Sequence, residues 1–271
     1  MRRKGERLSA LLLSGYFWLI VVYLLFPIAI VIPISFSSGQ FLQFPPEELG
    51  FRWYDAYFGD EIWVSSTLLS LRVAVMASLL ATVVGTMAVL FLERRAFRLK
   101  GLVMTAITSP IIIPHIFIAL GVFILAVRLG VEDSTLVLAG AHATIALPFV
   151  VLIVGAAARQ LDPTIERAAR VLGAGPLRAF FAATFPSLLP AIVAAAVFAF
   201  FVSFDELIIA EFLLSGQETL PMRIWADLRL EVSPTVAAVS TLLVVVTSLA
   251  MVGAEILRRR SAAQRDKENT P

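Results

Sequence analysis

The sequence contains no cysteine and only two histidines among its 271 residues. The absence of cysteine excludes disulfide bonds, thiol catalysis and cysteine-ligated metals. His115 and His142 have no carboxylate at metal-ligand spacing, so we expect no metal site and favour a hydrogen-bonded packing role for both. The chain also lacks a G-x-x-x-x-G-K-[ST] phosphate loop and any Ser-His-Asp or HExxH pattern, which predicts that it is not an enzyme and does not itself hydrolyse ATP. No cofactor is expected.

Charged residues are also scarce. They make up 15% of the chain, hydrophobic residues make up 59%, and the mean hydropathy is +0.89, whereas soluble proteins are roughly 25% charged. About 20 apolar residues in a helix span the hydrocarbon core of a bilayer. Six runs satisfy this criterion: Ala10–Ile34, Val64–Leu92, Leu102–Leu125, Leu136–Ala158, Leu188–Leu214 and Thr235–Leu257. The predicted fold is an all-α integral membrane protein with six transmembrane helices in one domain (residues 10–257) and short tails at 1–9 and 258–271.

The loops between these runs differ in basic residues. Most of the 22 lysines and arginines lie in the two tails, in residues 94–100 and in residues 159–178. The positive-inside rule therefore predicts that both termini and these two loops are cytoplasmic. Lipid is the expected surrounding of the chain. The net charge of +2 is explained by topology, and no nucleic-acid partner is expected.

Residues 162–190 form a polar segment between two apolar runs and are too charged to lie in lipid. Asp162 can cap a helix whose first residue is a proline, and Gly173 stands where a left-handed residue would end that helix. Pro176 can start a second short helix, which we expect to end before Pro186. The pattern predicts an amphipathic helical hairpin that binds a partner outside the membrane.

The hairpin resembles the cytoplasmic EAA loop of the inner-membrane permease subunits of ABC importers. That loop has the pattern E-A-A, three residues, G, nine residues, I-x-L-P. With Gly173 as the anchor, the two alanines fall on Ala168 and Ala169 and the last proline falls on Pro186. The resemblance implies a type I ABC importer permease fold.

This chain departs from the pattern at several positions. The glutamate position holds Arg167, with Glu166 one residue earlier, and the isoleucine and leucine positions hold Ala183 and Phe185. In the family, this loop, here residues 159–187, is the coupling helix that seats in a cleft of the ATPase. The resemblance implies the following ATPase-coupling residues: Glu166, Arg167, Ala168, Ala169, Gly173 and Pro186.

Two adjacent carboxylates, Asp205 and Glu206, lie inside the fifth apolar run. Carboxylates at membrane depth are costly unless they face a cavity or a partner. One interpretation is a substrate path that attracts a cation. The other is a structural pair with an arginine of another subunit, such as Arg72. Because neighbouring helical residues point about 100° apart, at most one of the two carboxylates can face a pore squarely.

Pro110 and Pro114 interrupt the third apolar run. Prolines inside a membrane helix leave backbone carbonyls that neighbouring helices or a water-filled cavity must satisfy. Broken helices often line translocation paths. A packing kink is an equally compatible interpretation.

Several stretches resemble the second permease of spermidine/putrescine importers: SFDE at 203–206, Leu220–Pro221, Ser233–Pro234 and GFRWYDAYF at 50–58. The resemblance implies a bacterial inner-membrane importer for a small cationic polyamine. It also implies three partners: an ABC ATPase dimer, a second, related permease subunit and a periplasmic substrate-binding protein. Related permeases carry opines, glycine betaine, aminophosphonates or ferric iron. An ATP-independent secondary transporter, an integral-membrane enzyme and a scaffolding subunit are the alternatives from other classes.

Overall fold

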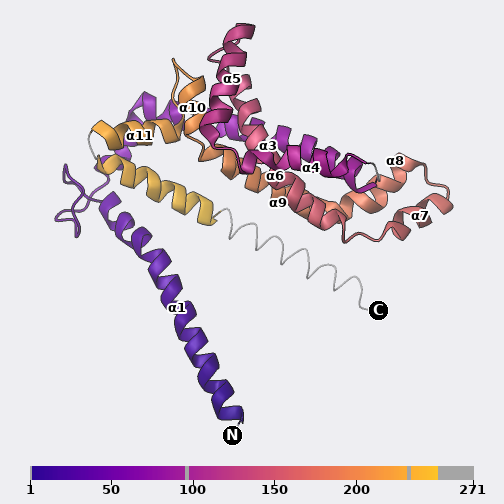
Figure 1. The fold of residues 1–271 in the computed structure, drawn as a ribbon. Helices are drawn as coiled ribbons and strands as arrows, with labels where there is room; N and C mark the ends of the chain where they lie inside the picture. Colours follow the sequence, from indigo (N-terminus) through magenta and orange to yellow (C-terminus); the bar gives the residue numbers. More distant parts are fainter. Residues whose placement is uncertain (1, 95–97, 231–232, 250–271) are drawn as a thin grey trace. The chain divides into compact units, whose positions relative to one another are not determined.

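The computed structural model describes residues 2–94, 98–230 and 233–249, and in these ranges the chain is helical and forms no strand. It divides into two compact units. The larger unit comprises residues 62–223. The smaller unit takes its described residues from 2–61 and from beyond residue 223. Each unit is described by itself (Figure 1).

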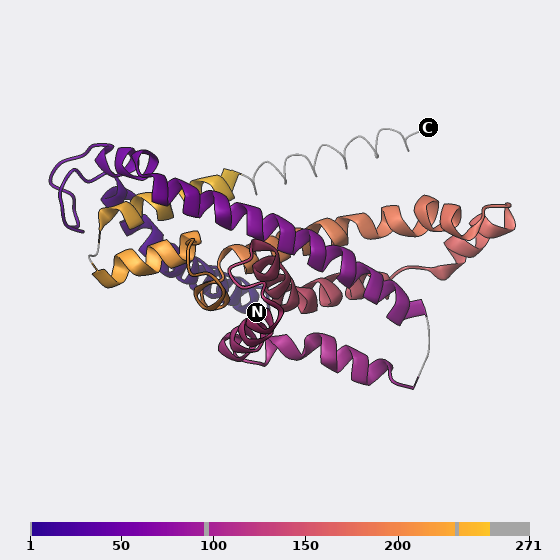
Figure 2. The ribbon, with the colours of Figure 1, turned by 90° about the horizontal axis from the view of Figure 1, so that it is seen from above.

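The larger unit contains three long helices and several shorter ones. Its elements, in chain order, are α3 (Glu61–Arg94), α4 (Lys100–Thr108), the 3-10 turn η1 (Ser109–Ile111), α5 (His115–Leu129), α6 (Thr135–Ala158), α7 (Pro163–Val171), α8 (Pro176–Ala179), the π-helical segment η2 (Phe180–Thr184), α9 (Phe185–Phe204), α10 (Ile208–Leu213) and the start of α11 (Leu220–Leu230). α6 and α9 pack along one another (Figures 1 and 2). α7 and α8 lie at one end of this unit in both views.

Small residues bring α3, α6 and α9 close together. One of the two core clusters consists largely of buried alanines from these helices, including Ala77, Ala146 and Ala195. Membrane helices gain little from hydrophobic exclusion against one another, so close backbone approach and interhelical hydrogen bonds hold them together. Ser78 supplies such a bond, since its hydroxyl donates to the backbone oxygen of Ala196 at 2.7 Å.

Gly85 lies where α3 closely approaches α6. A methyl group on Gly85 would lie 2.7 Å from Cγ1 of Val150 and 3.2 Å from Cδ1 of Leu147. We expect Gly85→Ala to destabilise the protein by about 1–3 kcal/mol, because the branched Val150 side chain cannot move aside without repacking. Thermal unfolding in detergent would measure this change. Gly121→Ala on α5 is the matched control, since no atom lies within 4 Å of its added methyl group; equal unfolding temperatures for the two variants would contradict the prediction.

The third apolar run is not one helix. α4 and α5 meet at an angle of 101° across η1 and Pro114. The run Leu102–Leu125 is therefore interrupted at the place where Pro110 and Pro114 predicted an interruption. Pro110 and Pro114 have no N–H to donate, and freed carbonyls are satisfied locally by hydroxyls, as where Ser109 Oγ donates to Ala106 O at 2.9 Å.

The fifth apolar run is also broken. α9 ends at Phe204 and α10 starts at Ile208, so Asp205 and Glu206 lie between two helices instead of inside one. Four helices of the described residues are long and apolar enough to cross a membrane, or five if the bent α4–α5 pair counts as one span. The predicted number of six is not confirmed. The sixth run is helical over Pro234–Leu249, and its residues 250–257 lie outside the described part of the chain.

The smaller unit contains α1 (Arg2–Ser35), α2 (Arg52–Gly59) and the loop between them. The aromatic residues of this loop and of α2 have separate roles. Tyr54 packs against Phe36 and exchanges a hydrogen bond of 2.7 Å with Ser35, and Trp53 donates to the backbone oxygen of Gly39 at 3.1 Å. Phe51 and Phe58 remain exposed.

Candidate functional site

Helix α7 begins as the sequence predicts. Pro163 is its first residue, and Asp162 is the N-cap, whose carboxylate accepts a hydrogen bond of 2.9 Å from the N–H of Thr164. This bond favours the ionised form and lowers the pKa of Asp162. The predicted start of the hairpin is confirmed.

Gly173 ends α7 in the left-handed conformation, with a φ of +92°. Its N–H donates to Arg170 O at 3.0 Å, and the N–H of Ala174 donates to Ala169 O at 3.1 Å. These two bonds form a Schellman motif, which satisfies carbonyls that the helix end would otherwise leave unpaired. The predicted role of Gly173 in the backbone is confirmed.

The second helix of the hairpin does not end before Pro186. α8 starts at Pro176 as predicted, but the chain continues through η2 into α9 and forms a helical segment over Pro176–Phe204. In η2 the N–H of Phe185 donates to Phe180 O, five residues back. This widened turn accommodates the proline ring that an α-helical turn would exclude. Proline in this context therefore redirects a helix without ending it.

The tip of the hairpin presents apolar side chains to its surroundings. Leu172 is 88% exposed and Leu177 is 74% exposed, and Ile165 and Val171 are exposed beside them. Ala168 is also exposed, and Ala169 is half-buried. A cluster of this kind at the end of a helical unit is typical of a surface that a partner covers.

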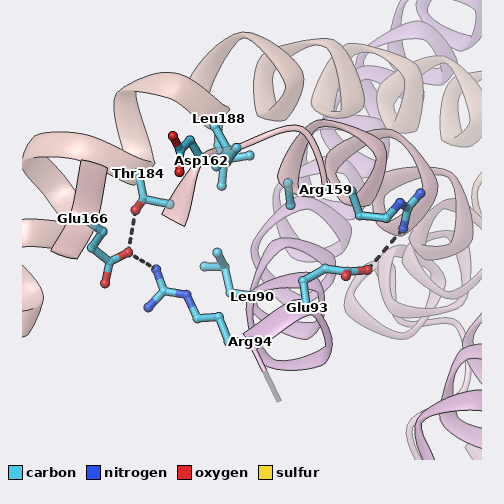
Figure 3. A pocket seen from close by; sticks show the side chains of 10 residues that line it. Leu90, Glu93, Arg94, Arg159, Asp162, Glu166, Thr184 and Leu188 are labelled. Carbon is cyan, nitrogen blue, oxygen red and sulfur yellow. Dashed lines mark hydrogen bonds and ion pairs between the residues drawn. The ribbon is translucent and has the colours of Figure 1, made fainter. Parts of the chain in front are cut away.

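Glu166 does not belong to that surface. Its carboxylate accepts hydrogen bonds from Arg94 Nη2 and Thr184 Oγ1, both at 2.6 Å, and from Arg170 Nη2 at 3.1 Å. Figure 3 shows Glu166 pointing to Arg94 and Thr184. The bond from Thr184, followed by the charges of the two arginines, lowers the pKa of Glu166, so the group is ionised at neutral pH. Arg167, its neighbour, is exposed.

A second acidic residue lies beside this cluster at the end of α3. Glu93 accepts hydrogen bonds from Arg159 at 3.1 Å and from Lys100 at 3.4 Å. Between the two clusters is a cavity of about 340 Å³, part of which Figure 3 shows. Its lining residues are Leu90, Glu93, Arg94, Ala158, Arg159, Leu161, Asp162, Glu166, Thr184 and Leu188.

Glu206 is buried at the break between α9 and α10. Its Oε2 accepts hydrogen bonds from the N–H groups of Ile209 at 2.7 Å and of Ala210 at 3.4 Å. The side chain therefore caps α10, and it competes with the backbone carbonyls that would continue α9. These bonds stabilise the break.

Both histidines of the chain meet Glu206. His115, at the start of α5, is joined to Oε1 by a hydrogen bond of 3.2 Å. Nε2 of His142, on α6, lies 3.6 Å from Oε2, and its Nδ1 is hydrogen-bonded to Ser203 Oγ at 2.9 Å. The expectation of hydrogen-bonded histidines is confirmed. Asp205, by contrast, is exposed, so the two adjacent carboxylates have different surroundings.

The structure thus brings the predicted residues together in two places, the hairpin and the α9–α10 break. They are separated by α9, whose 20 residues extend about 30 Å. Sequence reasoning missed Arg94 and Thr184 as partners of Glu166, and His115 as a partner of Glu206. No local signal marks them, because Arg94 and Glu166 are 72 residues apart and His115 and Glu206 are 91 apart. Within the described residues, no group of three or more histidine, aspartate or glutamate side chains is arranged so that it could hold a metal ion.

Comparisons with known proteins agree with this architecture. The chain is 31% identical over 265 residues to the putrescine transport system permease protein PotI of Escherichia coli K12, covering 93% of this chain and 94% of PotI. It is 28% identical over 253 residues to the spermidine/putrescine permease PotC of the same organism, covering 93% and 96%. A solved bacterial ABC transporter that imports alginate has a chain of similar fold, with a TM-score of 0.67, 14% identity and coverage of 94% of this chain and 97% of that one.

The family assignment follows from the region that matches. Residues 77–262, more than half of the chain, match the family described as binding-protein-dependent transport system inner membrane component. The match includes the whole hairpin and the α9–α10 break. This chain therefore belongs to the family of binding-protein-dependent transport system inner membrane components, as a transport permease subunit and not an enzyme.

Proposed function

We propose that the chain forms half of the translocation path of an ATP-driven importer for a small cationic solute, a polyamine such as putrescine or spermidine. The observation that carries this proposal is similarity over nearly the whole chain to a putrescine permease and a spermidine/putrescine permease. Two carboxylates at the α9–α10 break, Asp205 and Glu206, fit a cationic cargo.

ABC importer permeases work with an ATPase and with a substrate-binding protein, and one solved relative of similar fold was crystallised with a periplasmic protein carrying its alginate ligand. The chain is a multi-pass protein of the inner membrane. Beyond this, the proposal includes an ATPase dimer, a second, related permease subunit and cytoplasmic locations for both termini. The basic residues of the loops support that orientation.

The hairpin is the proposed contact with the ATPase. Its exposed apolar residues, Ile165, Leu172 and Leu177, offer a surface that an ATPase cleft would cover. The small residues Ala168 and Gly173 allow close seating, and Arg167 is exposed and free to reach a polar group of the partner. Pro186 acts indirectly, because it lies where η2 passes into α9 and so helps to set the direction of that helix.

In the proposed cycle, ATP binding closes the ATPase dimer and moves the hairpin. The second arm of the hairpin, formed by α8 and η2, is continuous with α9. The movement therefore reaches the α9–α10 break without an intervening loop. Asp205, which is exposed, would meet an amine first. Glu206 would join the path if its hydrogen bond to His115 opens.

Reconstitution in liposomes tests the proposal. The chain would be combined with its co-encoded permease, ATPase and binding protein, and ATP hydrolysis measured with putrescine, spermidine, glycine betaine or ferric iron. We expect stimulation by a polyamine, with uptake that stops when the ATPase subunit is left out. Stimulation by another cargo alone would refute the polyamine assignment, and uptake that persists without the ATPase would favour a secondary transporter.

A further inference from the structure

We propose that Glu166 is a positioning residue that braces the coupling hairpin against the end of α3, and that it is not a contact to the ATPase. This inference rests on the proposed function for its consequence in transport. The EAA pattern places a glutamate one residue later, at Arg167. The displacement by one position turns the side chain about 100° around the helix and gives it a different neighbourhood.

The neighbourhood of Glu166 is internal to the larger unit. Its three hydrogen-bond donors come from three elements: Arg94 from α3, Thr184 from η2 and Arg170 from α7 itself. The Glu166 side chain is only 16% exposed. A residue whose carboxylate already accepts three hydrogen bonds on its own chain has little capacity left for a partner.

The hydrogen bonds of Glu166 hold α7, which is otherwise connected to the rest of the unit by short non-helical segments at its two ends. α7 is joined to α6 by the short segment 159–162, and its other end passes through Gly173 into α8. The donor Thr184 is the last residue of η2, whose widened turn is the irregular point between α8 and α9. Glu166 on α7, the first arm of the hairpin, is therefore hydrogen-bonded to the residue at which η2 passes into α9.

The end of α3 is held on its other side as well. Glu93, next to Arg94, accepts from Arg159 at the end of α6 and from Lys100 at the start of α4. Two adjacent residues of α3 thus connect α4, α6, α7 and η2 through charged groups. Arg94 also packs over the ring of Phe180, the first residue of η2, with 5.3 Å between Cζ and the ring centroid. A movement of α7 would therefore be transmitted to α3 through Arg94 and to α9 through Thr184.

Without the bonds of Glu166, α7 could follow the ATPase while α3 lags behind. We expect Glu166→Gln to leave the complex assembled and ATP hydrolysis active, but to lower the amount of cargo transported per ATP by about five-fold or more, the lower range of measured couplings between sites. Arg94→Gln should have the same effect. Arg170→Gln is the matched control, because the ion pair of that arginine with Glu166 lies within α7.

A charge reversal distinguishes the brace from a general loss of structure. In an Arg170→Gln background, the combination Arg94→Glu with Glu166→Arg should recover coupling that each single reversal loses, since the pair is restored with opposite polarity. A Glu166→Gln variant that fails to bind the ATPase while Arg94→Gln binds it would overturn the inference, because it would make Glu166 a direct contact. Normal transport per ATP in Glu166→Gln would overturn it equally.

A measurement on the full chain in lipid nanodiscs keeps this test separate from the proposed function. Amide hydrogen exchange over residues 163–171 should be faster in Glu166→Gln and in Arg94→Gln than in the parent chain, and should change less in Arg170→Gln, which loses only an i,i+4 pair within the helix. This readout needs neither cargo nor ATPase. Equal exchange rates in all variants would refute the brace, whereas faster exchange in a chain that shows no cargo-stimulated ATP hydrolysis would keep the brace and reject the importer assignment.

Discussion

Replacing Gly173 by valine is expected to abolish binding of the ATPase subunit while leaving membrane insertion intact. The φ of +92° at Gly173 is a conformation in which a β-branched residue is strongly disfavoured, at a cost of about 1–3 kcal/mol. A helix of nine residues such as α7 has little stability of its own to offset that cost. The Schellman bonds would break, and the exposed apolar residues Val171 and Leu172 would lose their arrangement. Co-purification of the tagged permease with its ATPase measures the effect.

Gly175 provides the control for this experiment. It lies two residues further along, in an extended conformation with φ −62° and ψ 164° that valine adopts readily, and no atom lies within 4 Å of an added Cβ. Gly175→Val should therefore retain the ATPase. Retention by both variants would argue that the hairpin does not bind the ATPase, and loss by both would argue that side-chain bulk matters and that the backbone conformation does not.

Neutralising Asp205 and Glu206 together is expected to depress uptake of a cationic cargo by about 10- to 100-fold. The estimate corresponds to the loss of one hydrogen bond to a charged group, about 1.5–3 kcal/mol. Radiolabelled putrescine uptake into vesicles measures the result. The single variants Asp205→Asn and Glu206→Gln show how much of the loss in uptake is due to each carboxylate. Asp205 is exposed, whereas Glu206 is buried against His115 and His142.

Two further variants control for structure. Glu206→Leu removes the charge and also the hydrogen bonds to the N–H groups of Ile209 and Ala210, and should in addition lower stability by about 1 kcal/mol, a typical value for a lost hydrogen bond. Glu211→Gln changes an exposed carboxylate five residues further along, on α10, and should leave uptake unchanged. Unchanged uptake kinetics in the double variant would remove Asp205 and Glu206 from the path and favour their role as structural partners.

Local signals in the sequence predicted much of the hairpin. Asp162 before a proline, Gly173 after the last periodic residue and Pro176 at a new helix start act through backbone geometry within a few residues, so no tertiary contact can easily override them. The same locality explains the error at Pro186. A proline disfavours a regular α-helical turn, but it does not end a helix whose preceding turn widens to the π form, as η2 does.

The apolar runs predicted membrane helices, and Pro110 and Pro114 predicted the interruption of the third run, but the break in the fifth run was not predicted. The breaks at 109–114 and 205–207 lie inside runs that hydropathy alone treats as continuous. At the second break, a buried carboxylate takes over the backbone donors of the next turn. Its own cost of burial is offset by His115 and by those N–H groups. The ATPase-coupling role of the hairpin and the path role of Asp205 and Glu206 stay predictions.

By itself, the sequence determined that this protein is an all-helical membrane protein and where its hairpin begins and turns, because composition, periodicity and capping act over short chain distances. That it is a permease came from its resemblance to a known family. Only the tertiary structure decided which groups the charged residues pair with. Arg94 and Glu166, or His115 and Glu206, are far apart in the chain, and a charged side chain pairs with whichever partner the packing brings within hydrogen-bond distance. Loop charge predicts the side of the membrane on which Glu166 lies, whereas its three donors became identifiable only once α3, α7 and η2 were packed together.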